Sequence, residues 1–235
     1  MSTSVLPKGL LAMAAFAVGS IYNLSDRVLH SGSHHHHHDT IPRPERTEAA
    51  ELDRITDLPG LSKDGPSFEQ FSGYVDVAPT RHVFYWFVEK QGESDENTPV
   101  ILWTNGGPGC SGLLGLGTEH GPFNMDADGN LIPNPYSWNT EAHVLYVEQP
   151  ASVGFSYVDT DEDLVTGDIQ AAEDNHRFLR EFMTRFPERR ANPFYLSSES
   201  YGGHYMPFFA LELLKENTDN FFNFQGVMLG TSLYR

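Results

Sequence analysis

The run Ser198-Glu199-Ser200-Tyr201-Gly202-Gly203 places a serine among small residues, in a tight turn between a strand and a helix. The short apolar run 193–197, bounded by proline, is typical of a buried strand. Apolar residues at near-helical spacing follow over 204–215. This arrangement is typical of a nucleophile elbow, although Ser198 stands where the usual pattern has glycine. The run therefore predicts an α/β fold with Ser200 as nucleophile, and the alternative is an ordinary serine- and glycine-rich turn.

A second glycine-rich turn follows another apolar strand. The run 100–103 is apolar throughout and leads into Thr104-Asn105-Gly106-Gly107-Pro108-Gly109. Beside a nucleophile elbow, the loop after the third strand supplies one backbone N–H to the oxyanion, and the residue after the nucleophile supplies another. Gly107 and Tyr201 are the predicted donors. A nucleotide-binding loop is disfavoured, because the run has no Gly-Lys-Ser/Thr ending and does not form G-x-G-x-x-G.

These segments together resemble the serine carboxypeptidase family, over roughly residues 71–230. The resemblance rests on W-T-N-G-G-P-G-C-S at 103–111, E-Q-P and G-F-S-Y within 148–157, and E-S-Y-G-G-H-Y at 199–205. It implies the α/β-hydrolase fold, which has a mixed, mostly parallel sheet flanked by helices.

The resemblance also implies a reaction and a site. Family members release single residues from peptide C-termini through an acyl-enzyme, mostly at acidic pH. By resemblance, the substrate's terminal carboxylate would be bound by Asn105, Gly106, Glu119 and Glu199. Two glutamates would repel that carboxylate unless they share a proton, so that one stays neutral. The residues alone leave open that Glu119 is a solvated loop carboxylate and that Glu199 only favours the start of a helix.

The sequence does not offer an evident base for Ser200. Serine carboxypeptidases carry their triad Asp and His much further toward the C-terminus, whereas only His204 and Asp219 follow the serine here. His204 would lie against the preceding helical turn, so we expect it to pack rather than to act as a base. Asp219 lies in a polar stretch that predicts a loop. We therefore expect this chain to be inactive as an enzyme.

Two other functions stay open from the sequence. One is a non-catalytic fragment that binds peptides or a partner without turnover. The other is acyl transfer to an acceptor other than water, which some members of this family perform.

The order of predicted elements suggests an incomplete domain. The fold is expected to be truncated after the strand that follows the nucleophile helix, as in a truncated gene model, a splice variant or an N-terminal fragment. In the family, the cysteine at Cys110 pairs with a residue further on, so here the resemblance implies a free thiol. The predicted strands are 71–77, 82–88, 100–103, 144–147, 194–197 and 226–229, with a helix over 168–186.

The N-terminal region predicts targeting. Residues 1–19, with Lys8 before an apolar run, suit a signal peptide or an uncleaved anchor. Residues 20–48 are predicted to be a disordered linker, and its run His34–His38 is either a tag or natural. Residues 49–235 would form the incomplete α/β-hydrolase domain. We expect the secretory pathway, with the vacuole, the lysosome or the extracellular space as destination.

The net charge of the chain limits the classes of binding partner that we expect. The formal net charge of −17 argues against nucleic acid and anionic membrane surfaces. We expect peptide or protein C-termini as partners, with no metal and no cofactor. The oligomeric state is open, and a homodimer of a complete protein is one option.

Overall fold

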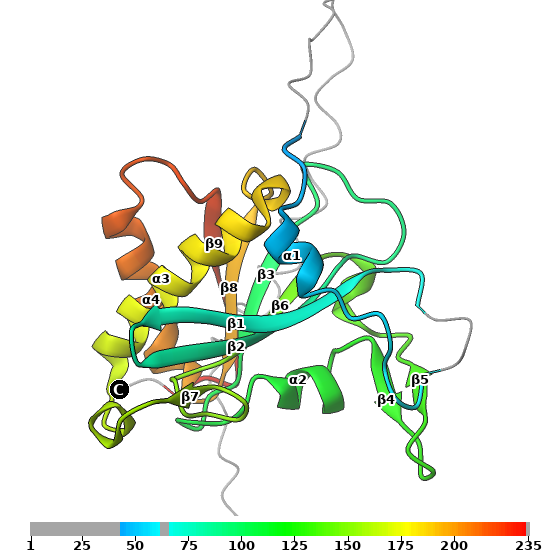
Figure 1. Cartoon of the computed structure of the whole chain (residues 1–235), viewed down its shortest axis with the longest axis horizontal. Coiled ribbons are helices and arrows are strands. Elements are labelled where there is room, and N and C mark those ends of the chain that lie inside the picture. Colours follow the sequence, from blue (N-terminus) through cyan, green and yellow to red (C-terminus); the bar gives the residue numbers. More distant parts are fainter. Residues whose placement is uncertain (1–42, 62–65, 234–235) are drawn as a thin grey trace, which may run out of the picture. The chain divides into compact units, whose positions relative to one another are not determined.

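The computed structural model describes residues 43–61 and 66–233. Its centre is a seven-stranded mixed sheet with the order β1-β2-β6-β3-β8-β9, in which β7 pairs with β2 (Figure 1). Strands β6, β3, β8 and β9 are parallel, and β1 and β2 add an antiparallel hairpin at one side. This confirms the predicted α/β-hydrolase architecture. The strands are β1 Gln70–Ala78, β2 Arg81–Val88, β3 Val100–Thr104, β6 His143–Glu148, β7 Tyr157–Val158, β8 Phe194–Glu199 and β9 Phe224–Gly230.

The central strands are apolar because both faces of the sheet are covered. Every residue of β3 and β6 is buried, as expected for parallel strands between two layers. Leu102 belongs to the main core and Trp103 to a second cluster, since successive side chains point to opposite faces of a strand.

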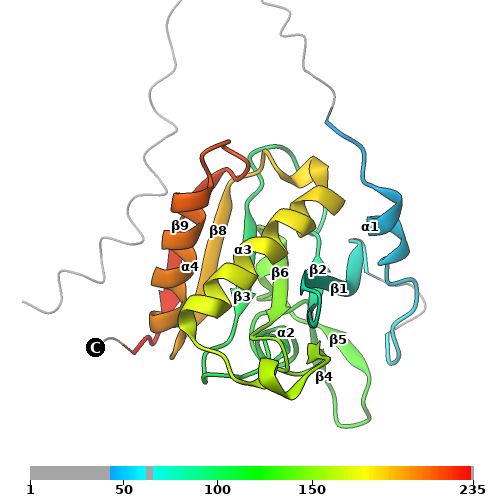
Figure 2. The same ribbon diagram turned by 60° about the vertical axis from the view of Figure 1, so that its left-hand side comes forward.

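Two long helices cover one face of the sheet. Helices α3 (Asp168–Arg185) and α4 (Gly202–Glu216) lie side by side, as both views show (Figures 1 and 2). The second cluster, on the opposite face, lies beneath the short helix α2 (Leu113–Thr118). The remaining elements are α1 Glu48–Leu52, the hairpin β4 Phe123–Met125 and β5 Leu131–Pro133, and 3-10 turns at Trp138–Thr140, Asp161–Leu164 and Pro187–Arg189.

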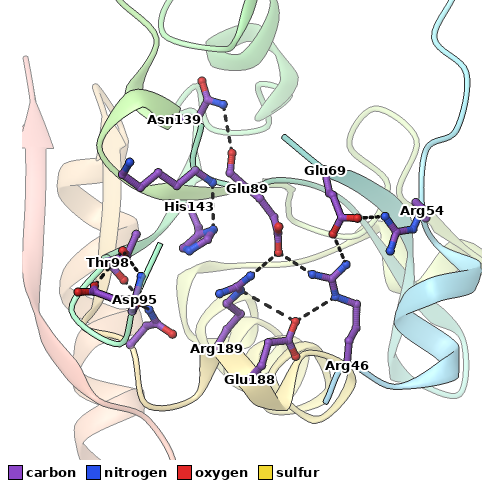
Figure 3. A network of polar contacts seen from close by, with 12 residues as sticks. Arg46, Arg54, Glu69, Glu89, Asp95, Thr98, Asn139, His143, Glu188 and Arg189 are labelled. Atoms are coloured by element: carbon purple, nitrogen blue, oxygen red, sulfur yellow. Dashed lines mark hydrogen bonds and ion pairs between the residues drawn. The ribbon is translucent and has the colours of Figure 1, made fainter. Parts of the chain in front are cut away.

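A network of ion pairs fastens the start of the described chain to the sheet (Figure 3). Arg46 donates to Glu69 at 2.6 Å, to Glu89 at 2.8 Å and to Glu188 at 3.1 Å. Arg189 also donates to Glu89, at 2.5 Å, and the side chains of Arg46 and Arg189 are only 14% and 7% exposed. We call these residues, together with Arg54 on Glu69, the arginine network.

The arginine network bears on the predicted domain boundary. The predicted linker 20–48 lies mostly outside the described residues, but its last part, 43–48, is described and contacts the domain through Arg46. The predicted signal segment 1–19 also lies outside them and stays a prediction. Among the helices of the described residues, none has the length and apolar character needed to cross a membrane.

Candidate active site

The turn at Ser200 has the backbone geometry of an elbow. Ser200 stands between β8 and α4 with a φ of 52°, a left-handed conformation that is uncommon for a residue with a side chain. A Cβ at Gly202 would lie 2.0 Å from the Ser198 hydroxyl oxygen. That hydroxyl donates to the carbonyl oxygen of Thr104 at 2.6 Å. The serine found in place of the usual glycine therefore ties the elbow to β3, and Gly202 leaves room for it.

The segment after β9 clamps the same turn. The Ser200 N–H donates to the Gly230 carbonyl at 3.1 Å, and its carbonyl accepts from the Leu233 N–H at 2.9 Å. A Cβ at Gly203 would lie 2.2 Å from the Leu233 carbonyl oxygen, so only glycine permits this approach. Both backbone groups of the predicted nucleophile are thus held by residues far along the chain.

The loop after β3 packs directly on the elbow. A Cβ at Gly106 would lie 2.5 Å from the Tyr201 nitrogen and 2.6 Å from the Glu199 carbonyl oxygen. Gly107 has a φ of 111°, which favours glycine. Neither the Gly107 nor the Tyr201 N–H has a protein acceptor within 43–61 and 66–233. Two unengaged donors therefore flank the serine turn.

A neutral amide joins the two predicted glutamates. The Asn105 Nδ2 donates to Glu199 Oε1 at 3.0 Å and to Glu119 Oε1 at 3.4 Å. Its Oδ1 accepts from the Trp103 indole at 2.9 Å and from the Gly115 N–H at 3.1 Å. Because two N–H donors fix the oxygen, the amide NH₂ must face the carboxylates. We call Asn105, Glu119 and Glu199 the carboxylate corner.

Trp103 and Gly115 were not predicted as site residues. Trp103 lies two residues before Asn105, which places both side chains on one side of an extended segment, and that spacing is the signal the sequence contained. A Cβ at Gly115 would lie 2.3 Å from the indole nitrogen of Trp103. Gly115 therefore gives the indole the space it needs to hold the amide.

Aromatic rings form the back wall of the carboxylate corner. His120 stacks on Trp138 with ring centroids 4.0 Å apart, and its Nδ1 lies 3.1 Å from the Tyr146 hydroxyl. Burial lowers the pKa of His120 to about 4, so its ring is neutral over most of the acidic range. No lysine or arginine among the described residues pairs with Glu119 or Glu199, so the corner carries no neutralising cation.

A buried carboxylate holds the far end of the loop after β3, the predicted oxyanion loop. Glu148, only 1% exposed, accepts from the Ser111 hydroxyl and from the Phe155 N–H at 2.5 Å. Gly154 has a φ of 59°, and a Cβ there would strike the same carboxylate. Glu148 therefore fixes Ser111 relative to the 149–156 loop.

The structure brings the predicted elbow, oxyanion and carboxylate residues together, but residues 43–61 and 66–233 place no base beside Ser200. His204 stacks on the Tyr201 ring with centroids 4.7 Å apart, and Asp219 pairs with Arg180 at 3.0 Å. In the part of the chain that the structure describes, no histidine hydrogen-bonds Ser200.

Comparisons with known proteins agree with this geometry. The model of the serine carboxypeptidase family matches residues 59–235. The chain is 50% identical over 190 residues to the lysosomal protective protein of Mus musculus, covering 80% of this chain and 39% of that protein. It is 44% identical over 165 residues to the vacuolar serine-type carboxypeptidase ATG42 of Saccharomyces cerevisiae, covering 70% of this chain and 32% of that protein.

A solved structure is similar over the same region. The prohormone-processing carboxypeptidase Kex1 of Saccharomyces cerevisiae superposes with a TM-score of 0.68 and 25% identity, covering 78% of this chain and 44% of that one. The chain thus spans less than half the length of each of these three proteins.

Proposed function

Because this chain belongs to the serine carboxypeptidase family, we propose that it binds the C-terminal carboxylate of a peptide and presents the last peptide bond to Ser200. The observation that carries the proposal is the Asn105 amide, which donates to Glu119 and Glu199 from a fixed orientation. The corner has one neutral donor and two acidic side chains, with no cation among the described residues. It therefore suits a carboxylate ligand only at acidic pH, where a proton can reduce the repulsion. The substrate class is therefore peptide or protein C-termini in acidic surroundings.

The proposed chemistry is acyl transfer to water. The Ser200 hydroxyl oxygen attacks the carbonyl carbon, the N–H groups of Gly107 and Tyr201 stabilise the oxyanion, and the terminal amino acid leaves with a proton. Water then hydrolyses the acyl-enzyme. One such donor is typically worth about 10²–10³ in rate.

The serine proton needs a base. In residues 43–61 and 66–233 no histidine hydrogen-bonds Ser200, so these residues alone support binding and oxyanion stabilisation without an activated nucleophile. Such a remnant retains roughly 10³–10⁴ over the uncatalysed reaction in serine proteases. This favours a second candidate for the chain as it stands, peptide binding without turnover.

Acid dependence follows from the carboxylate corner. A bound carboxylate would be a third negative charge beside Glu119 and Glu199. If the two glutamates share one proton, the neutral partner donates a hydrogen bond and repulsion falls. Two of the relatives are named as lysosomal and vacuolar proteins, which supports an acidic compartment of the secretory pathway for this chain.

Calorimetric titration of short peptides tests the binding step. At about pH 5, a peptide with a free C-terminus is expected to bind at least tenfold more tightly than its C-terminal amide, and the advantage should disappear near pH 8. Asn105→Asp, which replaces the donor by an acceptor of the same shape, should abolish the preference. Asn124→Asp on β4 adds the same charge elsewhere and should not. Equal binding of acid and amide by the unaltered chain would refute the proposed function.

A fluorophosphonate probe tests the nucleophile. We expect slow labelling of the chain, because Ser200 lacks a base among the described residues. Rapid labelling that Ser200→Ala prevents would show that the serine is activated and that the expectation of inactivity is wrong.

A further inference from the structure

A cavity of about 290 Å³ lies next to Tyr201, and none of the three carboxylate-corner residues lines it. It is open to solvent on one side and is bordered by the end of the loop after β3, the loop after β6 and the first turns of α3 and α4. At this size it has room for one side chain rather than for an extended ligand. The lining residues are Pro108, Gly109, Pro150, Ser152, Val153, Thr166, Gly167, Asp168, Tyr201 and Tyr205.

Asp168 is the one charged side chain in that lining. The Tyr201 hydroxyl donates to its carboxylate, 3.3 Å from each oxygen. A carboxylate has about four acceptor positions, so it can accept further donors from the cavity. The rings of Tyr201 and Tyr205 line the same space, and aromatic rings beside a carboxylate favour a cation.

The cavity lies on the side of Ser200 where the residue before the last in a bound peptide would extend. In the proposed function, the carboxylate corner holds the terminal residue, and Ser200 attacks the carbonyl of the residue before it. That preceding residue must extend from Ser200 away from the corner. Tyr201 follows the serine directly and lines the cavity, so a side chain that extends from the attacked carbonyl on this side of Ser200 would reach it.

We propose that this cavity binds the side chain of the residue before the last in a peptide substrate, and that Asp168 selects a lysine or arginine there. The proposal rests on the proposed function, because the corner sets the register of the peptide. Asp168 would be a specificity-determining residue. Its position in the first turn of α3 also stabilises the helix through the dipole, a structural role that would not discriminate between peptides.

The test is a set of peptides titrated into the full 235-residue chain at about pH 5. They are identical except for lysine, norleucine or glutamate before the last residue, each prepared as the free acid and as the amide. We expect the lysine acid to bind about fivefold more tightly than the norleucine acid, as for a partly exposed charge pair, and the glutamate acid to bind most weakly.

Three variants separate the carboxylate from the fold. Asp168→Asn keeps an oxygen that can accept from Tyr201 and should erase the preference for lysine. Asp168→Glu should retain it. Asp161→Asn removes the same charge from an exposed position in the 3-10 turn before α3 and should leave the preference intact.

The outcomes distinguish the two proposals. If free acids bind better than amides but lysine has no advantage, or the advantage survives in Asp168→Asn, the cavity proposal is wrong and the proposed function stands. If acids and amides bind equally, or no peptide binds, the proposed function is wrong and the cavity proposal falls with it. A lysine preference lost only in Asp168→Asn supports both.

Discussion

In the carboxylate corner, Glu119 and Glu199 face a single neutral amide, whereas in the arginine network Glu69, Glu89 and Glu188 face guanidinium groups. Both regions gather glutamates from segments that are distant in sequence. In the network each negative charge is matched by a positive one, and Arg46 alone reaches four carboxylates when Glu51 at 3.5 Å is included. In the corner the only partner that both glutamates share among the described residues is the neutral Asn105 amide.

This difference separates a structural use of glutamate from the ligand-binding use that we propose for the corner. Matched charges join distant segments, and removing one partner leaves the remaining charges of the network less well compensated. A group of acidic residues is therefore informative about function only once its counter-ions are known.

The largest expected effect breaks the arginine network. Arg46→Met leaves three glutamates without their shared partner and should lower the free energy of unfolding by about 3–5 kcal/mol, measured by urea denaturation. Peptide binding by the folded fraction should be unchanged. Arg43→Met removes one exposed pair, with Glu96 at 3.4 Å, and should cost less than about 1 kcal/mol. Equal losses in the two variants would show that the network has no special stabilising role.

The next largest effect concerns His120, in the aromatic wall behind the carboxylate corner, and the pH dependence of stability. Because burial lowers the pKa of His120 to about 4 while an unfolded histidine titrates near 6.5, only the unfolded state binds a proton between these values. The free energy of unfolding is therefore undiminished by His120 above about pH 6.5. Below that it falls by about 1.4 kcal/mol per pH unit toward pH 4. His120→Phe should flatten that slope in urea titrations at several pH values. An unchanged slope would mean that His120 is not buried as described.

The same substitution in both regions sharpens the comparison. Glu199→Gln supplies a permanently neutral donor and should improve binding of a peptide acid near pH 8 about tenfold, which is about 1.4 kcal/mol. Stability should change by less than about 0.5 kcal/mol. Glu69→Gln should do the reverse, lowering stability without changing the binding constant. If both variants affected only stability, the distinction between the two regions would be lost.

The smallest effect concerns His82, which lies between two aspartates. Unlike arginine, this counter-ion gains or loses its own charge with pH. His82 Nδ1 lies 2.6 Å from an Asp76 oxygen, and Nε2 lies 3.3 Å from an Asp159 oxygen. The bond to Asp76, followed by the weaker one to Asp159, raises the pKa of His82 above its usual value.

The sign of this effect is opposite to that of His120. The stabilisation by His82 is complete below about pH 6.5 and is lost as the pH rises through the higher folded pKa. His82→Gln should therefore cost up to about 1 kcal/mol near pH 5 and almost nothing near pH 9, by the same denaturation assay. A cost that did not depend on pH would show that packing on Tyr157 matters more than charge.

The sequence predicted what depends on short stretches of chain. All six predicted strands are present, and Pro, Gly or polar residues bound their apolar stretches, although β9 is mostly exposed. Periodicity was less reliable at the ends of helices. Ile169, an apolar residue at the start of α3, is 67% exposed, since the face that packs is centred on Phe178 and Phe182.

Features that depend on distant partners could not be predicted. Helix α2 has two glycines in six residues, so no helical pattern marked it. The arginine network joins Arg46 to Glu188, 142 residues away, and neither residue indicates the other. The carboxylate corner was predicted only because its residues lie in motifs resembling a known family, and its support by Trp103 and Gly115 came from the structure.

The clamp on the elbow has a consequence for synthesis. Ser200 leaves the ribosome well before Gly230 and Leu233, which bind its N–H and its carbonyl. At about 5–20 residues per second, the nascent chain carries this serine for seconds without the partners that hold its left-handed turn. The turn at Ser200, the proposed nucleophile, is therefore shaped late, after the strand beside it has been made.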